Sequence, residues 1–400
     1  MKVIVLDTHP VEDGRIIRHL NYLVRNNINT LSIHFNIDNP CLPEGHFSRV
    51  GEKGYRVNII HQQHEAINQI SLFANFTLLK RCPNLFRIID EYCSSKSEEI
   101  IIHIHNPTLL LVAVKIRSRH PNCKIVYDRH ELCENNAKGW LIKIPSFSRV
   151  LEYLTKSRID GVITISSEHN KKTQEMFPYS AVRVVQNFPE SAEYTFASIQ
   201  DKISSFGYKS VIKCIYIGSL NYHFDRDIPL ILHIAEIVLE KYANVTLTIG
   251  GHTRDPDLLQ HLNKLSKKYP DQFSYLGSIP RVDVVKLTQC SHIGFFFIRP
   301  ESSYWVKCSP NKVFEYIQCG AIPIVRADCD YVEDFQKYAL IFDRDSSDEE
   351  IIAGTLDLLE NPARMKNMMD LAFQASSNYS FETIAQNYIQ LYHDVLQKKV

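Results

Sequence analysis

The sequence SPNKVFEYIQCG at residues 309–320 leads directly into the apolar segment IPIV at residues 322–325. Ser309 is a favourable N-cap residue, and Pro310 suits the first helical position, where a backbone N–H has no partner in any case. Gly320 is expected to end the helix about three turns later. The stretch therefore predicts a helix followed by a buried strand, the repeating unit of α/β folds with a parallel sheet.

The start of this predicted helix is a candidate anion site. Its first backbone N–H groups have no partner within the helix, and the helix dipole is positive at this end. Lys312 lies in the first turn, where a cation is unfavourable unless a bound anion compensates it. Glu315 lies one turn beyond Asn311 and on the same face as Lys312, so it can accept hydrogen bonds from ligand hydroxyl groups behind the anion. A capped amphipathic helix without a ligand fits these residues equally well.

Length and composition limit the class of protein. The 400-residue chain is longer than one hydrophobic core usually serves, so we expect two domains. Hydrophobic residues make up 44% and charged residues 22%, which is typical of a soluble globular protein. Lys+Arg and Asp+Glu are equal at 45 each, so no bulk positive charge attracts nucleic acid, and any anion binding must be local.

Targeting and redox signals are weak. No stretch approaches about 20 apolar residues, and Asp7 interrupts the apolar N-terminus too early for a signal peptide. The 10 cysteines include no C-x-x-C pair, so neither a zinc site nor a redox pair is indicated. We therefore expect a cytoplasmic protein with reduced, mostly buried cysteines.

Strands alternate with helices in both halves, which predicts two parallel sheets covered by helices. We expect domains at residues 1–190 and 210–380, a polar linker at 189–209 and a C-terminal helix at 381–400. The predicted strands lie at residues 3–6, 30–33, 100–104, 124–127, 161–165 and 182–185, and then at 213–217, 245–249, 273–276, 293–297, 322–325 and 339–342. Ligands bind such sheets at the carboxyl ends of the strands, so a cleft between the two domains is the expected active site.

Three loops of the first half carry candidate polar residues. The loop after the first strand contains no G-x-G-x-x-G but offers Asp13 as a helix cap and Arg15 as a cation. Histidines follow two later strands, at 103 and 105 and at His130, where Glu131 can fix a tautomer. Their positions suit acid–base chemistry or hydrogen bonding to a sugar hydroxyl. Side chains alternate along a strand, so the rings of His103 and His105 should point in opposite directions, which argues against a metal site.

The second half offers a glycine turn and a cation. Gly218 follows a strand, and Arg226 lies just beyond it, where its guanidinium could bind phosphate bidentately. Asp-x-Asp triplets at residues 225–227, 328–330 and 343–345 could hold a divalent ion, but they adjoin helix starts or strand ends where Asp commonly caps or turns. We expect no metal from them.

Residues 138–158 combine five basic residues and one Glu with Trp140, Leu141, Ile142, Ile144 and Phe147. This composition suits docking on an anionic membrane surface. A domain helix with an apolar core face fits slightly better.

Taken in order, the motifs resemble glycosyltransferase family 4 over nearly the whole chain. No single motif is decisive, but the ordered set is a strong signal. The matching segments are HPVEDGRIIR at 9–18, HIHNP at 103–107, YDRHEL at 127–132, VITIS at 162–166, VVQN at 184–187, YIGSL at 216–220 and PNKVFEY at 310–316.

The resemblance implies the GT-B fold of two facing Rossmann-like domains, with a C-terminal helix able to cross back to the N-terminal domain. It also implies transfer of a sugar from a nucleotide diphosphate with retention of anomeric configuration and without a metal. Three groups of residues carry the implied roles. The implied catalytic residues are His130, which lies near the transferring sugar, Arg226 and Lys312. The implied donor-binding residues are Gly218, Arg226, Asn311, Lys312 and Glu315. The implied acceptor-side residues are Arg15, His105 and Glu131.

Two positions depart from the family pattern. Lys307 stands where a second Glu is frequent, and Ser219 stands where many members have Arg. The first departure leaves open which hydroxyl group of the donor sugar the protein recognises. The second leaves Arg226 and Lys312 as the main diphosphate cations.

The combined interpretation is a cytoplasmic hexosyltransferase of class EC 2.4. It uses a nucleotide sugar as co-substrate and no cofactor. Its acceptor is expected to be a glycan or a lipid-linked molecule in surface polysaccharide or glycolipid synthesis, with the enzyme on the inner face of the plasma membrane. Two alternatives remain, a GT-B nucleotide-sugar epimerase and a catalytically silent partner subunit. Nucleic acid is not an expected partner.

Overall fold

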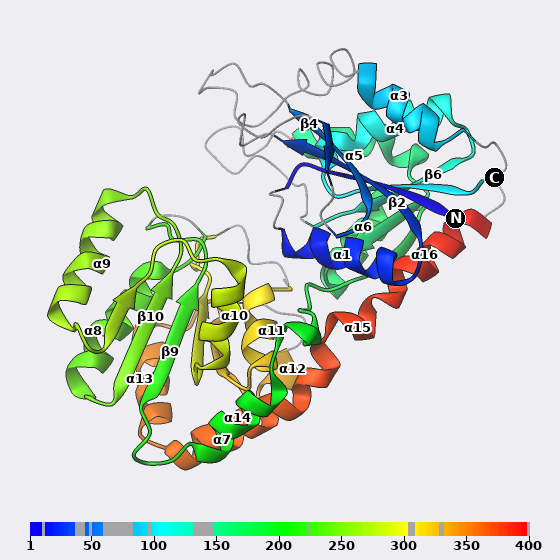
Figure 1. The fold of residues 1–400 in the computed structure, drawn as a ribbon. Helices are drawn as coiled ribbons and strands as arrows, with labels where there is room; N and C mark the ends of the chain where they lie inside the picture. Colours follow the sequence, from blue (N-terminus) through cyan, green and yellow to red (C-terminus); the bar gives the residue numbers. More distant parts are fainter. Residues whose placement is uncertain are drawn as a thin grey trace. The chain divides into compact units, whose positions relative to one another are not determined.

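The computed structural model describes residues 1–9, 13–36, 45–47, 50–58, 83–94, 98–130, 147–222, 225–302, 309–327 and 332–397. The chain forms two compact units, one comprising Met1–Gln186 with Ile384–Val400 and the other Asn187–Thr383. Each unit contains one sheet with helices packed against it (Figure 1). The predicted α/β architecture with two parallel-sheet, Rossmann-like domains is confirmed.

The first unit has an eight-stranded sheet in the order β3-β4-β2-β1-β5-β6-β7-β8. All neighbouring strands are parallel except β3 and β4. Strands β1 and β5 are wholly buried over Val3–Leu6 and Ile100–Ile104, as expected for central strands covered on both faces. The strand bounds are Lys2–Asp7, Asn29–Asn36, Gly45–Phe47, Lys53–Asn58, Ile100–Ile104, Cys123–Asp128, Gly161–Thr164 and Ala181–Val184 for β1 to β8.

The first helix, α1 (Gly14–Arg25), begins as the sequence predicts. Asp13 caps it by accepting hydrogen bonds from the backbone N–H groups of Arg15 and Ile16, at 2.9 and 3.1 Å. The other helices of this unit include α3 (Pro83–Tyr92), α4 (Leu110–Arg119), α5 (Phe147–Thr155) and α6 (Ser167–Met176), with short 3-10 turns at Pro107–Leu109 and Lys156–Arg158.

The C-terminal helix belongs to the first unit. Helix α15 (Phe381–Ile384) leads into α16 (Gln386–Gln397), whose residues Tyr388, Leu391, Tyr392 and Val395 form one fully buried stripe. At Gly161 on β7 an added Cβ would lie 2.8 Å from Val395 Cγ1, so the glycine permits this close packing. The predicted return of the C-terminal helix to the N-terminal domain is confirmed.

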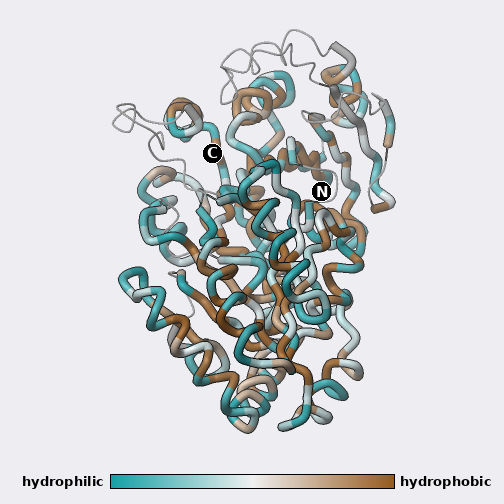
Figure 2. The backbone as a smooth tube through the Cα atoms, turned by 90° about the vertical axis from the view of Figure 1, so that its left-hand side faces the viewer, coloured by the Kyte–Doolittle hydropathy of each residue, from teal (hydrophilic) through white to brown (hydrophobic). Residues whose placement is uncertain are grey.

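The second unit has a six-stranded, fully parallel sheet in the order β11-β10-β9-β12-β13-β14. Hydrophobic residues, brown in Figure 2, follow the strands, whereas the outer helices alternate between brown and teal. Strands β9 to β14 span Ile212–Ile217, Val245–Gly250, Phe273–Tyr275, Ile293–Phe297, Ile322–Arg326 and Leu340–Phe342. The helices are α7 (Phe196–Ser205), α8 (Ile228–Lys241), α9 (Pro256–Lys268), α10 (Arg281–Gln289), α11 (Asn311–Gln318), α12 (Val332–Phe335), α13 (Asp348–Leu359) and α14 (Pro362–Ala375).

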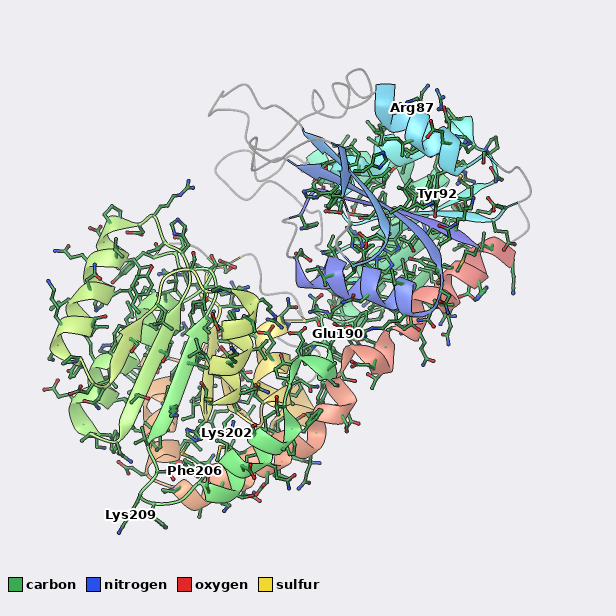
Figure 3. All side chains as sticks on the ribbon, viewed as in Figure 1. Arg87, Tyr92, Glu190, Lys202, Phe206 and Lys209 are labelled. Carbon is green, nitrogen blue, oxygen red and sulfur yellow. The ribbon has the colours of Figure 1, made fainter. Side chains whose placement is uncertain are left out.

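The interpretation of residues 189–209 as a linker is wrong. This segment contains α7, and its residues Ile199 and Ile203 lie in the core of the second unit. Lys202 on the same helix donates to the carbonyls of Ser291 and Cys319, both at 2.7 Å, and so binds it to the ends of α10 and α11 (Figure 3). Because only one narrow face of α7 is buried, the helix needs few apolar residues, and most of its sequence is polar.

Helix α11 ends as predicted. Gly320 has a φ of +57°, the N–H of Ala321 bonds the carbonyl of Tyr316, and the N–H of Gly320 bonds that of Ile317. These two bonds define a Schellman motif, for which glycine is preferred. Among the described residues, no helix is long and apolar enough to cross a bilayer.

Candidate functional site

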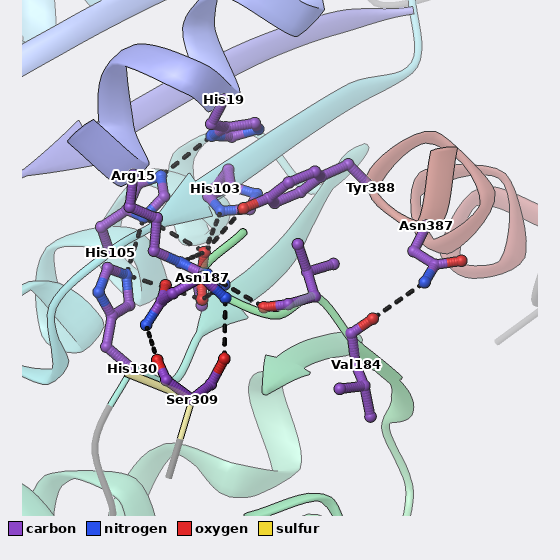
Figure 4. Close-up of polar contacts among 12 residues, drawn as sticks. Arg15, His19, His103, His105, His130, Val184, Asn187, Ser309, Asn387 and Tyr388 are labelled. Carbon is purple, nitrogen blue, oxygen red and sulfur yellow. Dashed lines mark hydrogen bonds and ion pairs between the residues drawn. The ribbon is translucent and has the colours of Figure 1, made fainter. Parts of the chain in front are cut away.

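The start of α11 differs from the prediction in one respect. The helix begins at Asn311 with Pro310 as N-cap, and the assignment of Ser309 as the capping side chain is wrong. Ser309 Oγ instead accepts from the backbone N–H of Asn187 at 3.1 Å, and the Ser309 carbonyl accepts from Asn187 Nδ2 at 3.2 Å (Figure 4). Pro310 provides no capping side chain, so the first-turn N–H groups remain suited to an external anion.

Lys312 lies where the strand order in the sheet of the second unit reverses. Chain order runs from β9 outward through β10 to β11, and from β12 outward through β13 to β14, so the strand order reverses between β9 and β12. Gly218 directly follows β9, and an added Cβ there would lie 2.4 Å from Lys312 Cε. Doubly wound sheets bind ligands at this reversal, outside the carboxyl ends of the strands.

The charges around Lys312 are mixed but mainly positive. Burial lowers the pKa of Lys312, the nearby Arg226 and Arg281 lower it further, and Glu315 opposes them. Arg226 pairs with Asp225 at 2.8 Å and lies over the ring of Phe296 at 4.9 Å. A phosphate group here would pair with Lys312, whereas Arg226 and Arg281 already have carboxylate partners.

Glu315 is nearly buried, with 9% of its surface exposed. Its Oε1 accepts a hydrogen bond from Arg281, the first residue of α10. Arg281 also donates to Glu193 Oε2, at 3.1 Å from Nε and 2.6 Å from NH2. Sequence reasoning missed Arg281, because nothing near Glu315 in the sequence indicates a partner in another helix.

The predicted donor-side residues are therefore found together in part. Gly218, Arg226, Lys312 and Glu315 lie around the β9–β12 reversal, and Asn311 is exposed at the first position of α11. Ser219 uses its carbonyl to accept from the hydroxyl of Tyr216 at 2.8 Å. Lys307 lies outside the described residues.

Of the Asp-x-Asp residues that the structure describes, Asp225 and Asp227 have partners for their carboxylates, and Asp343 takes part in a turn through its backbone. Asp227 caps α8 by accepting from the backbone N–H of Leu230 and pairs with Arg326, while Asp225 pairs with Arg226. Asp343 begins a turn in which its N–H donates to Ser346 Oγ at 3.1 Å. Asp328 and Asp330 lie outside the described residues.

A second cluster of polar side chains lies in the first unit, where its strand order reverses between β1 and β5. Arg15 at the start of α1 binds the carboxylate of Asp128 with two hydrogen bonds, at 3.0 Å from Nε and 2.8 Å from NH2. It also donates to the carbonyl of Val185 at 3.0 Å. Arg15 and Asp128 are 5% and 0% exposed, so this is a buried ion pair.

Four histidines surround this ion pair (Figure 4). His19 Nδ1 lies 3.0 Å from His105 Nε2, and His105 Nδ1 lies 3.0 Å from His130 Nε2. The second ring nitrogen of His19 also has a partner, because the Tyr392 hydroxyl lies 2.8 Å from both His19 Nε2 and His103 Nδ1. His9 stacks on His130 with ring centroids 5.1 Å apart.

Burial keeps these imidazoles neutral. It lowers the pKa of His19 and His105 well below the usual value, lowers that of His103, and brings that of His130 to about 3. For Asp128, burial alone would raise the pKa, but the charge of Arg15 outweighs it and holds the pKa well below its usual range. The site therefore holds one carboxylate, one guanidinium and four uncharged imidazoles near neutral pH.

The expectation that His103 and His105 point in opposite directions is wrong. Strand β5 ends at Ile104, so alternation no longer applies to His105, and the two ring centroids are 4.6 Å apart. Two groups consequently bring three possible metal ligands within 4.8 Å of one another, His19 with His103 and His105, and His105 with Asp128 and His130. In the second group the Asp128 carboxylate is already held by Arg15. In both groups the histidines lie at hydrogen-bond distances from one another or from Tyr392.

Of the predicted acceptor-side residues, the structure describes Arg15 and His105, and both are buried. His105 is 1% exposed, whereas the side chain of His130 is 19% exposed and can meet a ligand. Arg15 lies behind both, bound to Asp128. Glu131 lies outside the described residues. His19, Tyr388 and Tyr392 belong to the same cluster but were not anticipated, because they lie on helices with ordinary apolar faces.

Two surface hollows lie on other elements. One of about 640 Å³ is lined by Phe86, Arg87, Asp90, Glu91 and Arg119. The other, of about 1070 Å³, borders α7 and α10 and includes Lys202, Lys213 and Lys286. Lys202 is bound to two carbonyls and Lys286 lies 3.7 Å from Asp283, so these cations already have partners.

Comparisons with known proteins agree on the fold. The sequence matches no protein-family model and no curated protein. Among solved structures, the chain is similar to a sucrose-phosphate synthase from Thermosynechococcus elongatus, with a TM-score of 0.69, 13% identity and full coverage of both chains. It is also similar to a trehalose-6-phosphate protein from E. coli bound with UDP-2-fluoro glucose, with a TM-score of 0.66, 15% identity and full coverage of both chains.

A third similar structure is HepE from Anabaena in complex with UDP and glucose. It shares 12% identity with this chain at a TM-score of 0.66, and the match covers 98% of this chain and 100% of HepE. The fold is that of the GT-B glycosyltransferases, which confirms the predicted fold class. At these identities the likeness establishes the architecture and not the particular family.

Proposed function

We propose that this protein is a retaining glycosyltransferase of the family 4 type that transfers a sugar from a nucleotide diphosphate to a hydroxyl-bearing acceptor. One observation carries the proposal: Lys312, at the start of α11, packs against Gly218 where the strand order of the second sheet reverses. A helix N-terminus, a partly buried cation and a glycine turn at that position form a seat for a diphosphate.

The donor-side roles follow from this seat. In the transfer, the bond between the anomeric carbon and the diphosphate oxygen breaks, and its electron pair stays on the diphosphate. Lys312, Arg226 and the backbone N–H groups at Asn311 would stabilise that developing charge. Glu315, oriented by Arg281 through Oε1, would accept hydrogen bonds from the ribose hydroxyls.

We assign His130 to the transferring sugar and place Arg15, His105 and Glu131 on the acceptor side. Because Arg15 and His105 are buried, they would act by holding His130 in place rather than by contacting the acceptor. The new bond joins the acceptor oxygen to the anomeric carbon, and the proton of the acceptor hydroxyl passes to the departing diphosphate.

A lipid-linked or glycan acceptor at the inner face of the plasma membrane is the finer part of this proposal. On α5, Tyr153 and Leu154 are 62% and 65% exposed, and Val150 shares a face with Leu154. Lys156 lies 4.0 Å from the ring centroid of Tyr153. The exposed apolar residues of α5, together with Lys156 and Arg158 in the 3-10 turn that follows it, suit an anionic lipid surface, while Leu151 and Glu152 lie on the buried face. Residues 138–146 of the predicted membrane segment lie outside the described residues.

The test is a screen of nucleotide sugars by thermal shift, followed by assays for release of the nucleotide diphosphate. A ligand at 100 times its dissociation constant adds about 2.7 kcal/mol to the free energy of unfolding. Release that requires an acceptor supports a transferase. Release without any acceptor would favour the epimerase, and binding without release would favour a silent partner subunit. The three structural neighbours named above give the epimerase alternative no support.

A further inference from the structure

The buried histidines of the first unit form one continuous hydrogen-bonded chain with a tyrosine of the C-terminal helix. In order, the chain links His103 Nδ1, the Tyr392 hydroxyl, His19 Nε2, His19 Nδ1, His105 Nε2, His105 Nδ1 and His130 Nε2. Each link measures 2.8 to 3.0 Å. Three of the four rings are at most 1% exposed, and the chain reaches partial exposure at His130.

A neutral imidazole carries one N–H donor and one acceptor nitrogen. In such a chain, the proton position on one ring therefore determines the position on the next. Two arrangements satisfy every link and also let the buried Tyr392 O–H donate within the chain. In one, all four histidines carry the proton on Nε2, and in the other all four carry it on Nδ1.

The buried end of the chain decides between them. His103 Nε2 lies 3.8 Å from Asp128 Oδ2, and among the described residues no hydrogen-bond partner satisfies this nitrogen. A protonated Nε2 would point its N–H at the carboxylate, whereas an unprotonated Nε2 would place a lone pair against a negative charge. Both nitrogens of the link between His105 and His130 lie near Asp128, with His105 Nδ1 3.4 Å from Oδ2 and His130 Nε2 3.6 Å from Oδ1, so its proton is near the carboxylate in either arrangement. That link does not distinguish them, so His103 sets the direction.

We propose that Tyr392 is a positioning residue that transmits this choice to His130, so that His130 carries its proton on Nε2 and presents Nδ1 as a hydrogen-bond acceptor to a ligand hydroxyl. The Tyr392 O–H donates to His103 Nδ1, and its oxygen accepts from His19 Nε2–H. His19 Nδ1 then accepts from His105 Nε2–H, and His105 Nδ1 accepts from His130 Nε2–H. The acceptor nitrogen of His130 suits a sugar, whose hydroxyl groups are donors.

The part of this inference that concerns a ligand rests on the proposed function, whereas the tautomers do not. They can be measured in the ligand-free protein with ¹⁵N-labelled histidine by long-range ¹H–¹⁵N correlation, with His130→Gln used to assign the His130 signals. We expect Nε2–H tautomers for His19, His103, His105 and His130 at neutral pH. A Nδ1–H tautomer at His130 in the wild-type protein would overturn the proposal whatever reaction the protein catalyses.

Tyr392→Phe tests the transmission. Removing the hydroxyl takes the donor from His103 and the acceptor from His19, and the tautomer ratio of His130 should shift toward Nδ1–H by up to about tenfold, the ratio that one net hydrogen bond supports. Tyr388→Phe is the matched control: Tyr388 is equally buried one turn earlier on α16 and stacks on His19, but its hydroxyl donates to Asp128 Oδ2 at 3.4 Å and not to a histidine, so its loss leaves Asp128 freer to attract His103 Nε2–H and should not shift His130 toward Nδ1–H. An unchanged ratio in Tyr392→Phe, or an equal shift in Tyr388→Phe, would refute the role of Tyr392.

A metal ion is the competing explanation for this cluster, and the same protein tests it. Titration with Co²⁺ should give no stoichiometric absorption band from tetrahedral histidine ligands, and the histidine spectrum should be unchanged after treatment with EDTA. A 1:1 band that disappears in His105→Gln would replace the hydrogen-bonded chain with a metal site. The wild-type spectrum alone decides the direction of the chain if Tyr392→Phe does not fold.

Discussion

Arg281 donates a hydrogen bond to Glu315 Oε1 across 34 residues of sequence, from the first residue of α10 to the second turn of α11. The same guanidinium holds Glu193, so one arginine joins two carboxylates. This relationship makes Glu315 a fixed rather than a mobile acceptor. A carboxylate held through one oxygen can receive ligand hydroxyls without first losing side-chain freedom.

Replacing Glu315 with Gln should weaken nucleotide binding and leave the fold intact. The amide keeps an oxygen for Arg281 but removes the charge that strengthens hydrogen bonds from the ribose, a loss of about 1.5–3 kcal/mol. Isothermal titration with nucleoside diphosphates measures this loss. Glu193→Gln is the matched control, because it loosens the same arginine without touching the proposed ribose site. Equal affinities for wild type and Glu315→Gln would show that Glu315 does not bind the nucleotide.

Turnover should survive an excess of EDTA. The proposed site stabilises the diphosphate with Lys312, Arg226 and a helix terminus, and the carboxylates of Asp225 and Asp227 are already held in ion pairs and a helix cap. The measurement is the release of nucleotide diphosphate before and after dialysis against chelator. Loss of activity that Mn²⁺ or Mg²⁺ restores would disprove the metal-free mechanism.

The protein should bind anionic vesicles at low salt and leave them at high salt. Each basic residue near such a surface contributes roughly 1 kcal/mol, and this contribution is screened by salt. Sedimentation with vesicles rich in phosphatidylserine is the assay. The double variant Tyr153→Ser with Leu154→Ser should bind less while remaining equally stable, because both side chains are mostly exposed. Absence of binding at low salt would remove the membrane from the proposal and favour a soluble acceptor.

The first unit should lose stability between pH 7 and pH 5. Burial lowers the pKa of His19, His103, His105 and His130, so below about pH 6.5 the unfolded chain binds protons that the folded unit does not. The free energy of unfolding then falls by at most about 1.4 kcal/mol per histidine per pH unit. Asp128 contributes in the same direction only below about pH 4, where its unfolded form begins to protonate.

Hydrogen exchange followed by mass spectrometry can resolve this loss by unit. Among the described residues of the second unit, His292 is the comparable histidine, and burial lowers its pKa to about 3. The protection of the second unit should therefore decline much less than that of the strands around the four-histidine cluster. Equal decline in both units would contradict the assignment of four neutral, buried imidazoles.

The strands were predictable because the central strands of a parallel sheet read as short, continuous apolar runs. The predicted strands at 100–104 and 293–297 coincide with β5 and β12. Helices with narrow apolar faces were harder, and α7 was interpreted as a linker although Ile199 and Ile203 anchor it. The predicted start of α11 was also wrong by one residue, because the Ser309 hydroxyl accepts a hydrogen bond from the backbone N–H of Asn187 and does not cap the helix.

The candidate site was predictable only where its residues are local in sequence. Gly218, Lys312 and Glu315 follow strands or begin helices in motifs that can be read directly. Arg281 and Tyr392 are different, since Tyr392 lies 289 residues from His103 and occupies a position in an ordinary apolar stripe. A tyrosine in such a stripe packs in the core whether or not its hydroxyl makes a hydrogen bond. Only the tertiary structure shows the partners of that hydroxyl.

The central claim is that Lys312 seats the departing diphosphate, and Lys312→Ala tests it most directly. Burial lowers the pKa of Lys312, so the folded protein disfavours its charge and the variant should be as stable as wild type or slightly more so. Turnover should fall by 10²–10³, roughly 2.7–4 kcal/mol of transition-state stabilisation. Lys264→Ala, at an exposed position on α9, should change neither quantity. The decisive measurement is the pair of melting temperature and turnover on Lys312→Ala: an unchanged melting temperature with lost turnover is the predicted result, and a folded variant with undiminished turnover would contradict the claim.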